Sequence, residues 1–494
     1  MRVLIFHGYL LRGTGSNIYN TNLCRALAAL GHEVHICCQE RHPEDVGLPQ
    51  GVTVHTPDIG RTLPVYVADT YEGFDAVPFP DLADDALEHY LRSNVEAVAA
   101  VAERVRPDVA LANHLIMGPA ILARALGGRV PYAVKVHGSA LEYTVRPHRE
   151  RFLPYAREGL DGATAVLVGS RHTAESLWEV MGDPGLPDRT RLGPPGVDVE
   201  SFAPASPERA AGALEELAAR LDAGATAGWG GEPGAGAALR SLDPVRETIV
   251  SYVGKLIVSK GVDLLLAAWP LVVDRVPRAR LCVVGFGTYR DTLHAFADAL
   301  AAADLDALRA IAARGREPEG GPAGELTYLA GFLDGLEGER RGAYLRAAPV
   351  AAERLVFTGR LEHDDLPALL PACSAQVVPS TFPEAFGMVA AEAAACGVLP
   401  LSAAHSGLAE VTAVLEQALE DDLRPLLSFA RGPGSVEEIA QKLTAWLLLG
   451  PEERARATDA LARTAHARFG WEAVAEGVIA AAEGRLDALV SPTD

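Results

Sequence analysis

The chain has 494 residues, of which 49% are hydrophobic and 22% charged, and its 44 basic and 65 acidic side chains give a formal net charge of −21. The length predicts two to four domains, and the composition is typical of a globular protein. The acidic balance argues against nucleic acid or an anionic membrane as the main partner.

The six cysteines show no CxxC spacing and mostly lie in apolar stretches, which is typical of a reduced, cytoplasmic protein. The N-terminal stretch MRVLIFHGYL reads as a first strand and not as a signal peptide. Because polar residues and glycines interrupt the apolar runs, we predict no transmembrane helix. Cytoplasmic localisation is the expectation that follows.

The first 40 residues predict a β-α-β unit: a buried strand, a glycine turn at 13–16, an amphipathic helix over 17–31 and a second strand. Such a unit predicts a parallel sheet with right-handed crossovers. We therefore expect a doubly wound α/β domain over residues 1–198. Its predicted strands cover residues 2–6, 32–38, 108–113, 132–138 and 165–170.

A second α/β series begins at residue 248, so residues 199–467 predict a second domain of the same kind. Two segments interrupt it: 203–245, read as a short helix and a flexible linker, and 288–353, read as two or three helices. The closing segment 468–494 carries an amphipathic helix that we expect to pack back on the first domain. Strands are predicted at 248–254, 280–287, 354–361 and 375–380.

Two open sheets in tandem usually bind ligands at the carboxyl ends of their strands, which directs attention to the loop after the strand at 375–380. The stretch TFPEAFGMVAAEAAACG, residues 381–397, predicts a loop with Glu384 and a helix with Glu392. Carboxylates in this loop and helix could accept hydrogen bonds from sugar hydroxyls in a partly dry cleft. The alternative is that Glu384 caps the helix and Glu392 faces solvent.

The start of this predicted helix is itself a candidate anion site. Its first N–H groups, at Phe386, Gly387 and Met388, have no partner within the helix and lie at the positive end of its dipole, an arrangement that suits a diphosphate. In YVGKLIVSKG, residues 252–261, Lys255 and Lys260 flank a turn between a strand and a helix. Both side chains can converge on phosphates.

Together these stretches resemble the GT-B glycosyltransferases of the retaining family 4 type. Their pattern G-[R/K]-L-x-x-x-K-G, followed by PExFGxxxxEAxAxG, occurs here at 254–261 and 383–397. GHEVHICC, KVHGS, PPGVD and the final FGWEAVAEGV are also similar to the family. The resemblance covers nearly all of the chain except the two insertions. It implies a GT-B fold, with two Rossmann-like domains facing a central cleft.

The resemblance also implies roles for individual residues. Lys255 and Lys260 would neutralise the donor diphosphate and stabilise the leaving nucleotide. Glu392 would hold the nucleotide ribose and Glu384 a hydroxyl of the transferred sugar, while the amides of 386–388 would contact sugar and phosphate.

In the first domain, Gly13 and Gly15 would let the backbone approach the same phosphates. Arg360 and Leu361 would line the site of the nucleobase. His137 matches the family histidine near the reacting carbon and would orient the donor sugar or assist proton movement. Its alternative role is that of a satisfied polar residue at a strand end.

The implied activity is retaining transfer of a hexosyl unit from a nucleoside-diphosphate sugar, UDP- or GDP-linked, by a front-face route without an enzymic nucleophile and without a metal or other cofactor. Three alternatives stay open: a glycoside phosphorylase, a sugar-nucleotide-processing enzyme and a non-catalytic sugar-nucleotide-binding protein. GTGSNI is an imperfect dinucleotide fingerprint and indicates a dehydrogenase only weakly. The acidic residues at 304–306 fall in a helical run, so no metal site is predicted there.

The acceptor, which could be a small molecule, a glycan or a lipid-linked molecule, would bind to loops of the first domain. Asn113 and His114 follow a predicted strand and are candidates for contact with it. Arg146 and Arg149 could receive a phosphorylated acceptor, or they could belong to a solvated helix face. The aromatic residues of 61–79 suit either stacking on a sugar or a lid packed on itself. A homodimer is left open.

Overall fold

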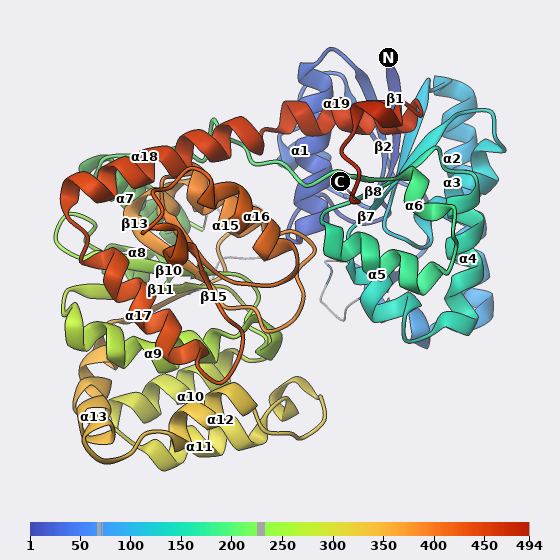
Figure 1. Cartoon of the computed structure of the whole chain (residues 1–494). Coiled ribbons are helices and arrows are strands. Elements are labelled where there is room, and N and C mark those ends of the chain that lie inside the picture. The colour runs from blue at the N-terminus through green and yellow to red at the C-terminus, as the bar shows by residue number, and fades with distance from the viewer. Residues whose placement is uncertain (67–70, 72, 225–232, 494) are drawn as a thin grey trace. The chain divides into compact units, whose positions relative to one another are not determined.

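The computed structural model describes residues 1–66, 71, 73–224 and 233–493, and the chain divides into two compact units (Figure 1). Unit 1 contains Met1–Gly196 and Phe469–Asp494, and unit 2 contains Val197–Arg468. The centre of the predicted linker, 225–232, lies outside the described residues, as do 67–70 and 72 of the predicted aromatic segment.

Unit 1 is built on a parallel sheet, which in the described part of the chain has seven strands. After Arg2, the strand RVLIF is apolar and buried, as expected where helices cover both faces of a parallel sheet. A separate pair of strands, β4 (Thr62–Val65) and β5 (Asp75–Pro78), lies outside it. In sheet order, the seven strands are β3 (Val52–His55), β2 (Glu33–Cys37), β1 (Arg2–Phe6), β6 (Val109–Asn113), β7 (Tyr132–Val136), β8 (Ala165–Val168) and β9 (Thr190–Leu192).

The last helix of the chain belongs to unit 1. Helix α19 packs against α1 and the strands β6 to β8, and its Trp471, Val478 and Ile479 enter the same apolar cluster as Val3 and Leu111. The helices of unit 1 are α1 (Gly15–Ala29), α2 (Asp84–Val105), α3 (Gly118–Leu126), α4 (Arg149–Asp161), α5 (Arg171–Met181), α6 (Leu186–Arg189) and α19 (Trp471–Ala482).

Unit 2 repeats the plan with a second parallel sheet, of six strands among the described residues. In sheet order these are β12 (Leu355–Gly359), β11 (Ala279–Val284), β10 (Thr248–Val253), β13 (Cys373–Val378), β14 (Leu399–Ala403) and β15 (Ser428–Phe429). The helices outside the second predicted insertion are α7 (Pro207–Asp222), α8 (Ala235–Arg240), α9 (Val262–Arg275), α14 (Leu366–Leu369), α15 (Met388–Ala395), α16 (Ser406–Glu416), α17 (Ser435–Leu447) and α18 (Pro451–Arg468). Two doubly wound parallel sheets confirm the predicted fold class.

The predicted insertion 288–353, described throughout, forms four helices instead of two or three. They gather at one end of unit 2, in yellow in Figure 1. Their bounds are α10 (Arg290–Ala301), α11 (Leu305–Arg314), α12 (Thr327–Asp334) and α13 (Gly338–Glu353).

Two local predictions need correction. Helix α1 begins at Gly15, so half of the predicted glycine turn is already helical. Asp304 is not inside a helical run but is the N-cap of α11, where its carboxylate accepts hydrogen bonds from the backbone N–H groups of Asp306 at 3.1 Å and Ala307 at 3.0 Å. Among the described residues, no helix is long and apolar enough to cross a membrane.

Candidate functional site

In unit 2, Glu384 lies in the loop between β13 and α15, and its backbone is held in place by the start of helix α16. The Glu384 N–H donates to the hydroxyl of Ser406 at 2.8 Å, and the Glu384 carbonyl accepts from the N–H of Gly407 at 3.0 Å. A Cβ on Gly407 would lie 2.5 Å from the Cα of Phe386, so this close approach of the loop to helix α16 requires glycine.

The Glu384 carboxylate is paired with the second lysine of the predicted phosphate-binding turn. It forms an ion pair with Lys260 and accepts a hydrogen bond from the hydroxyl of Ser380. Burial alone would raise the pKa of Glu384, but the charge of Lys260 and these hydrogen bonds bring the pKa below its ordinary value. Lys260 and Glu384 therefore lie in direct contact, and Glu384 is ionised at neutral pH.

Glu392 lies on helix α15 with an exposed fraction of 2%. Its carboxylate is 2.8 Å from Nε2 of His363, in the loop after β12. Burial would lower the pKa of His363, but the Glu392 carboxylate, with a contribution from Asp364, raises it to about 10. His363, whose ring packs 5.3 Å from that of Phe202, is therefore an imidazolium at neutral pH.

The start of helix α15 excludes the interpretation in which Glu384 caps the helix and Glu392 faces solvent. Gly387, with φ of 123°, is the N-cap of a helix that begins at Met388, and no described side chain caps it. Glu384 therefore does not cap this helix, and the buried Glu392 does not face solvent. A Cβ on Gly387 would approach a methyl group of Leu408 to 2.7 Å. The first backbone N–H groups of α15 come directly after the loop that carries Glu384. An anion site at a helix N-terminus is built from such N–H groups.

The other predicted donor-site residues gather around Phe286, in the loop after β11. The Lys255 ammonium lies 6.0 Å from the centre of the Phe286 ring, and the Arg360 guanidinium lies 4.7 Å from it. Arg360 also pairs with Glu362 at 3.1 Å, and Leu361 between them is partly buried. The loops after β10, β11 and β12 thus bring two cations and an aromatic ring together.

In unit 1, His137 follows β7 and ends a line of buried polar side chains. Its Nε2 lies 2.7 Å from Oδ1 of Asn113, whose amide nitrogen donates to Oδ1 of Asn20 at 2.8 Å. Asn20 in turn donates to His7 at 3.0 Å, and His7 lies 2.9 Å from Asn17. The three Asn–His contacts therefore connect the carboxyl ends of β1, β6 and β7 through helix α1.

This network defines the chemistry open to His137. Burial, followed by the neighbouring His114, Lys135 and His7, holds the pKa of His137 well below its ordinary value, so the ring is neutral. Because Oδ1 of Asn113 can only accept, Nε2 of His137 carries the proton and Nδ1 has a free electron pair. Neutral His137 can thus accept a hydrogen bond from a hydroxyl group.

Of the two predicted acceptor contacts beside it, Asn113 has both amide hydrogens used within unit 1, because its amide nitrogen also donates to the carbonyl of Phe6 at 3.2 Å. His114 is different: it is 2% exposed, has φ of 68°, and neither ring nitrogen has a hydrogen-bond partner among the described residues. The ring of Tyr66, from the predicted aromatic segment, lies 4.7 Å from that of His114. His114, the first residue after β6, thus places a buried imidazole next to the ring of Tyr66.

The two arginines predicted to receive a phosphorylated acceptor have partners in unit 1. Arg146 pairs with Glu142 at 3.0 Å and with Glu179 at 3.1 Å, and Arg149 donates to the carbonyl of Val180 at 2.7 Å. These contacts fit the alternative that both arginines belong to a helix face, and neither arginine takes a role in the proposed function below.

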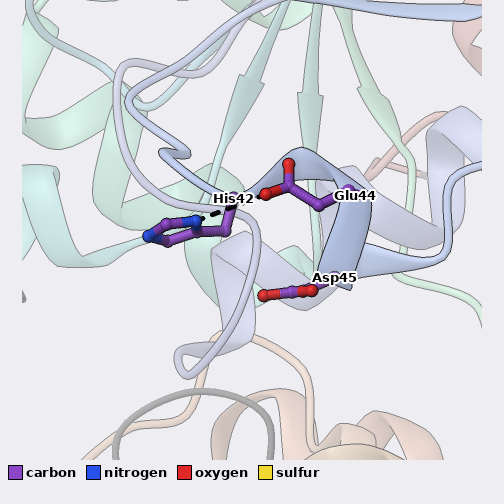
Figure 2. A group of neighbouring side chains, drawn as sticks. All are labelled: His42, Glu44 and Asp45. Carbon is purple, nitrogen blue, oxygen red and sulfur yellow. Dashed lines mark hydrogen bonds and ion pairs between the residues drawn. The ribbon is translucent and has the colours of Figure 1, made fainter.

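The glycine loop of unit 1 leaves space in front of helix α1. Gly13 has φ of 96°, a conformation that favours glycine, and a Cβ on Gly15 would meet nothing within 4 Å. Elsewhere in unit 1, the exposed His42, Glu44 and Asp45 bring their ligand atoms within 4.8 Å of one another (Figure 2). Exposed acidic groups often gather in this way without an ion, and we assign none to them.

Sequence reasoning missed His363, which pairs with the Glu392 carboxylate, and the residues after β14 that hold the Glu384 loop. His363 follows Arg360 by three residues in the loop after β12, so a basic residue at a strand end was an available signal. Ser406 and His405 lie after β14, a strand that was not predicted; Nε2 of His405 donates to the carbonyl of Ser380 at 2.7 Å. Both sets of contacts join segments more than 20 residues apart.

Comparisons with known proteins agree on one family. The family model of Glycosyltransferase Family 4 matches residues 13–201, and that of Glycosyl transferases group 1 matches residues 337–461. The D-inositol 3-phosphate glycosyltransferase of Frankia alni is 26% identical over 480 residues, covering 94% of this chain and 93% of its own. A mannosyltransferase of Mycolicibacterium smegmatis, described as a GDP-mannose-dependent alpha-(1-6)-phosphatidylinositol monomannoside mannosyltransferase, is 29% identical over 40% of this chain and 42% of its own.

Solved structures share the fold at low identity. Sucrose-phosphate synthase from Thermosynechococcus elongatus has a TM-score of 0.59 at 19% identity, covering 99% of each chain. HepE of Anabaena, solved in complex with UDP-glucose, has a TM-score of 0.58 at 17% identity and covers 99% of this chain and 100% of its own. With two parallel-sheet units and both family models matched in order, the chain belongs to the GT-B glycosyltransferases of family 4 and group 1, and it is a glycosyltransferase.

Proposed function

We propose that this glycosyltransferase moves a hexosyl unit from a nucleoside-diphosphate sugar, UDP- or GDP-linked, to a hydroxyl acceptor with retention of configuration. The observation that carries the proposal is the arrangement around α15 in unit 2. Its first amides follow the Lys260–Glu384 pair, and the Glu392–His363 pair lies one turn into the helix. Two carboxylates separated by an amide-lined helix start suit the two ends of a sugar nucleotide better than one scissile bond.

In this proposal Glu392 accepts hydrogen bonds from the ribose hydroxyls, and Glu384 from a hydroxyl of the transferred sugar. Lys255 and Lys260 neutralise the charge that develops on the departing diphosphate, and the amides of 386–388 contact sugar and phosphate. Support for such a donor comes from HepE, which was solved with UDP-glucose, and from the relative described as GDP-mannose-dependent.

The proposed reaction follows a front-face route. The acceptor oxygen forms a bond to the anomeric carbon on the face from which the diphosphate leaves, the bond between that carbon and the diphosphate oxygen breaks, and a phosphate oxygen takes the acceptor proton. Glu392 is paired with His363 and buried, so it does not suit the role of a nucleophile. Gly13 and Gly15 would admit the phosphates, Arg360 and Leu361 would line the nucleobase, and neutral His137 would orient a sugar hydroxyl.

Thermal shift with UDP, GDP, ADP and dTDP tests the donor, because a ligand at 100 times its Kd stabilises the folded state by about 2.7 kcal/mol. We expect UDP or GDP to raise Tm in the wild type. Glu392→Ala is expected to weaken nucleotide binding about tenfold or more, the cost of losing a charged hydrogen-bond partner. Glu384→Ala is expected to spare the nucleotide and lower the rate of sugar transfer. Glu353→Ala, which removes an exposed carboxylate on α13, is the control for both.

Equal loss of nucleotide affinity in the Glu384 and Glu392 variants would contradict the division of roles. Nucleotide binding without transfer or donor hydrolysis would favour a binding protein. Turnover of a glycoside with free phosphate would favour a phosphorylase, and conversion of the sugar nucleotide without an acceptor would favour a sugar-nucleotide-processing enzyme. The anomeric configuration of the product, measured by NMR, decides retention.

A further inference from the structure

The turn that carries Lys260 is a single 3-10 turn, η4 (Val258–Lys260), between β10 and α9. The first N–H of such a turn has no partner inside it. Here the Val258 N–H donates to Oε1 of Glu319 at 2.6 Å. A carboxylate that accepts from a backbone N–H makes a charge-assisted hydrogen bond, roughly twice as strong as a neutral one. Glu319 therefore acts as the cap of the lysine turn.

Glu319 reaches this turn from the four-helix insertion. It ends η5 (Glu317–Glu319), between α11 and α12, and its side chain is 8% exposed. Its second oxygen lies 3.3 Å from Nε of Arg316, and its own N–H donates to the Arg316 carbonyl at 3.0 Å. The charge of this carboxylate is thus balanced inside the insertion while Oε1 accepts the hydrogen bond from Val258.

The loop that presents Glu319 is closed on itself. Gly315 has φ of 58°, and a Cβ there would lie 1.6 Å from the carbonyl oxygen of Gly324, so the chain passes itself with no space for a side chain. The N–H of Gly321 also returns to the Arg316 carbonyl at 3.1 Å. The insertion therefore offers a formed loop, and little ordering is needed to place the carboxylate.

On its other side, the lysine turn is bound to the loop that carries Glu384. The Ser259 carbonyl accepts from the N–H groups of Thr381 at 2.9 Å and Phe382 at 3.3 Å. A displacement of the turn would thus move Lys260 and the Glu384 loop together.

We propose that Glu319 is a positioning residue for donor binding: from the insertion, it fixes the turn on which Lys260 pairs with Glu384. The proposal rests on the proposed function, since it takes the donor diphosphate as the ligand of Lys260. It also gives the 288–353 insertion a role in the donor half of the reaction.

The test uses the full chain and three variants. Glu319→Ala removes the carboxylate, and Glu319→Gln keeps an oxygen that can accept from the Val258 N–H. Glu317→Ala is the matched control, because Glu317 lies on the same turn with a side chain that is 48% exposed. Hydrogen–deuterium exchange of residues 256–261 and 381–388 reports on the turn, and titration with UDP and GDP reports on donor binding.

For Glu319→Ala we expect faster exchange in both segments and nucleotide binding about tenfold weaker, from the loss of one charged hydrogen bond. Glu319→Gln is expected to restore the slow exchange and to stay within about threefold of the wild-type affinity. Unchanged exchange in Glu319→Ala would overturn the role as a cap. Faster exchange with unchanged affinity would overturn the positioning role. If the wild type binds neither nucleotide, the proposed function fails and takes the positioning role with it, whereas the exchange data still decide whether Glu319 holds the turn.

Discussion

Glu392 and Glu384 each have a cationic partner within their own unit, and the two pairs differ in a way that matters for binding. The Glu384 pair is partly open, with side chains of Glu384 and Lys260 that are 22% and 30% exposed. The Glu392–His363 pair is more deeply buried, since the Glu392 side chain is 2% exposed. A buried charge is costly unless it is paired, and Glu392 gives the charged His363 ring such a partner.

Replacement of His363 by alanine is therefore expected to destabilise unit 2. Breaking a buried ion pair by removing one partner costs about 3 kcal/mol, because the other charge is left without compensation. His363→Gln, which keeps a hydrogen-bond donor, is expected to cost less. Urea unfolding of the three proteins at pH 6 measures the difference.

The pH dependence of this loss distinguishes an imidazolium from a neutral imidazole. The pKa of His363 is raised in the folded state to about 10. The stability it adds is then fully present below its ordinary pKa of about 6.5 and is lost as the pH rises through about 10. The gap between wild type and His363→Ala should shrink from pH 6 to pH 10, and a gap that stays constant would mean a purely neutral contact.

At the scale of elements, helices α3 and α4 approach each other so closely that their contact depends on a glycine. A Cβ on Gly159 in α4 would lie 2.3 Å from the Cβ of Pro119 and 2.6 Å from the backbone nitrogen of Ala120 in α3. Gly159→Ala is therefore expected to destabilise unit 1 by about 2 kcal/mol, as overpacking outweighs the better helix propensity of alanine.

Gly212 in α7 is the matched control, because it is an exposed helical glycine whose added Cβ would meet nothing within 4 Å. There the same substitution should stabilise unit 2 by roughly 0.5–1 kcal/mol through helix propensity alone. Urea unfolding followed by circular dichroism gives both values. Stabilisation by both substitutions would show that helix propensity, and not helix packing, decides the effect at these positions.

The elements that the sequence predicted well are those with a continuous apolar pattern. Strands such as β1 and β6 are buried along their length, so their hydrophobic runs are visible without any tertiary information. The strand β14 was missed because LPLSA contains a proline and because only residues 396–398 separate it from the alanine-rich helix α15. Four insertion helices were undercounted because their capping residues, such as Asp304, resemble helix interiors in an Ala- and Leu-rich segment.

The candidate site was predictable where its residues share one local motif. Lys255, Lys260, Glu384 and Glu392 stand in two short stretches, and glycines and a helix start mark those stretches. The partner of Glu392 was not predictable in the same way, because His363 and Glu392 are 29 residues apart in the chain. Such a contact depends on the order of strands in the sheet, and the local pattern carries no information about that order.

At the scale of the whole molecule, the acidic balance of the chain makes the placement of its few cations informative. A net charge of −21 disfavours the approach of an anionic donor, since a nucleoside diphosphate carries negative charge itself. Only 44 of the residues are Lys or Arg, yet Lys255, Lys260 and Arg360 all follow strands of the unit 2 sheet. In the proposed function, local cations and helix amides would supply the attraction that the overall charge does not.

The path of the chain also makes unit 1 depend on a segment that is distant in sequence. The chain leaves unit 1 after Gly196 and returns at Phe469. A Cβ on Gly196 would lie 2.6 Å from the Trp471 ring, so the outgoing segment packs directly on the returning helix α19. The Leu192 N–H also donates to the carbonyl of Val490 at 2.8 Å.

A chain that ends at Arg468 should therefore lose the fold of unit 1 while it keeps that of unit 2. Trp471, Val478 and Ile479 are part of the unit 1 core, and burial of each large apolar side chain contributes about 1.5–3 kcal/mol. Their combined loss is of the order of the whole stability of a domain, about 5–15 kcal/mol. Hydrogen–deuterium exchange should show β6 to β8 unprotected and β10 to β14 protected. A chain that ends at Val490 retains α19 and the bond to Leu192, so it should match the full protein. Equal protection of β6 to β8 in all three chains would mean that unit 1 folds without its returning helix.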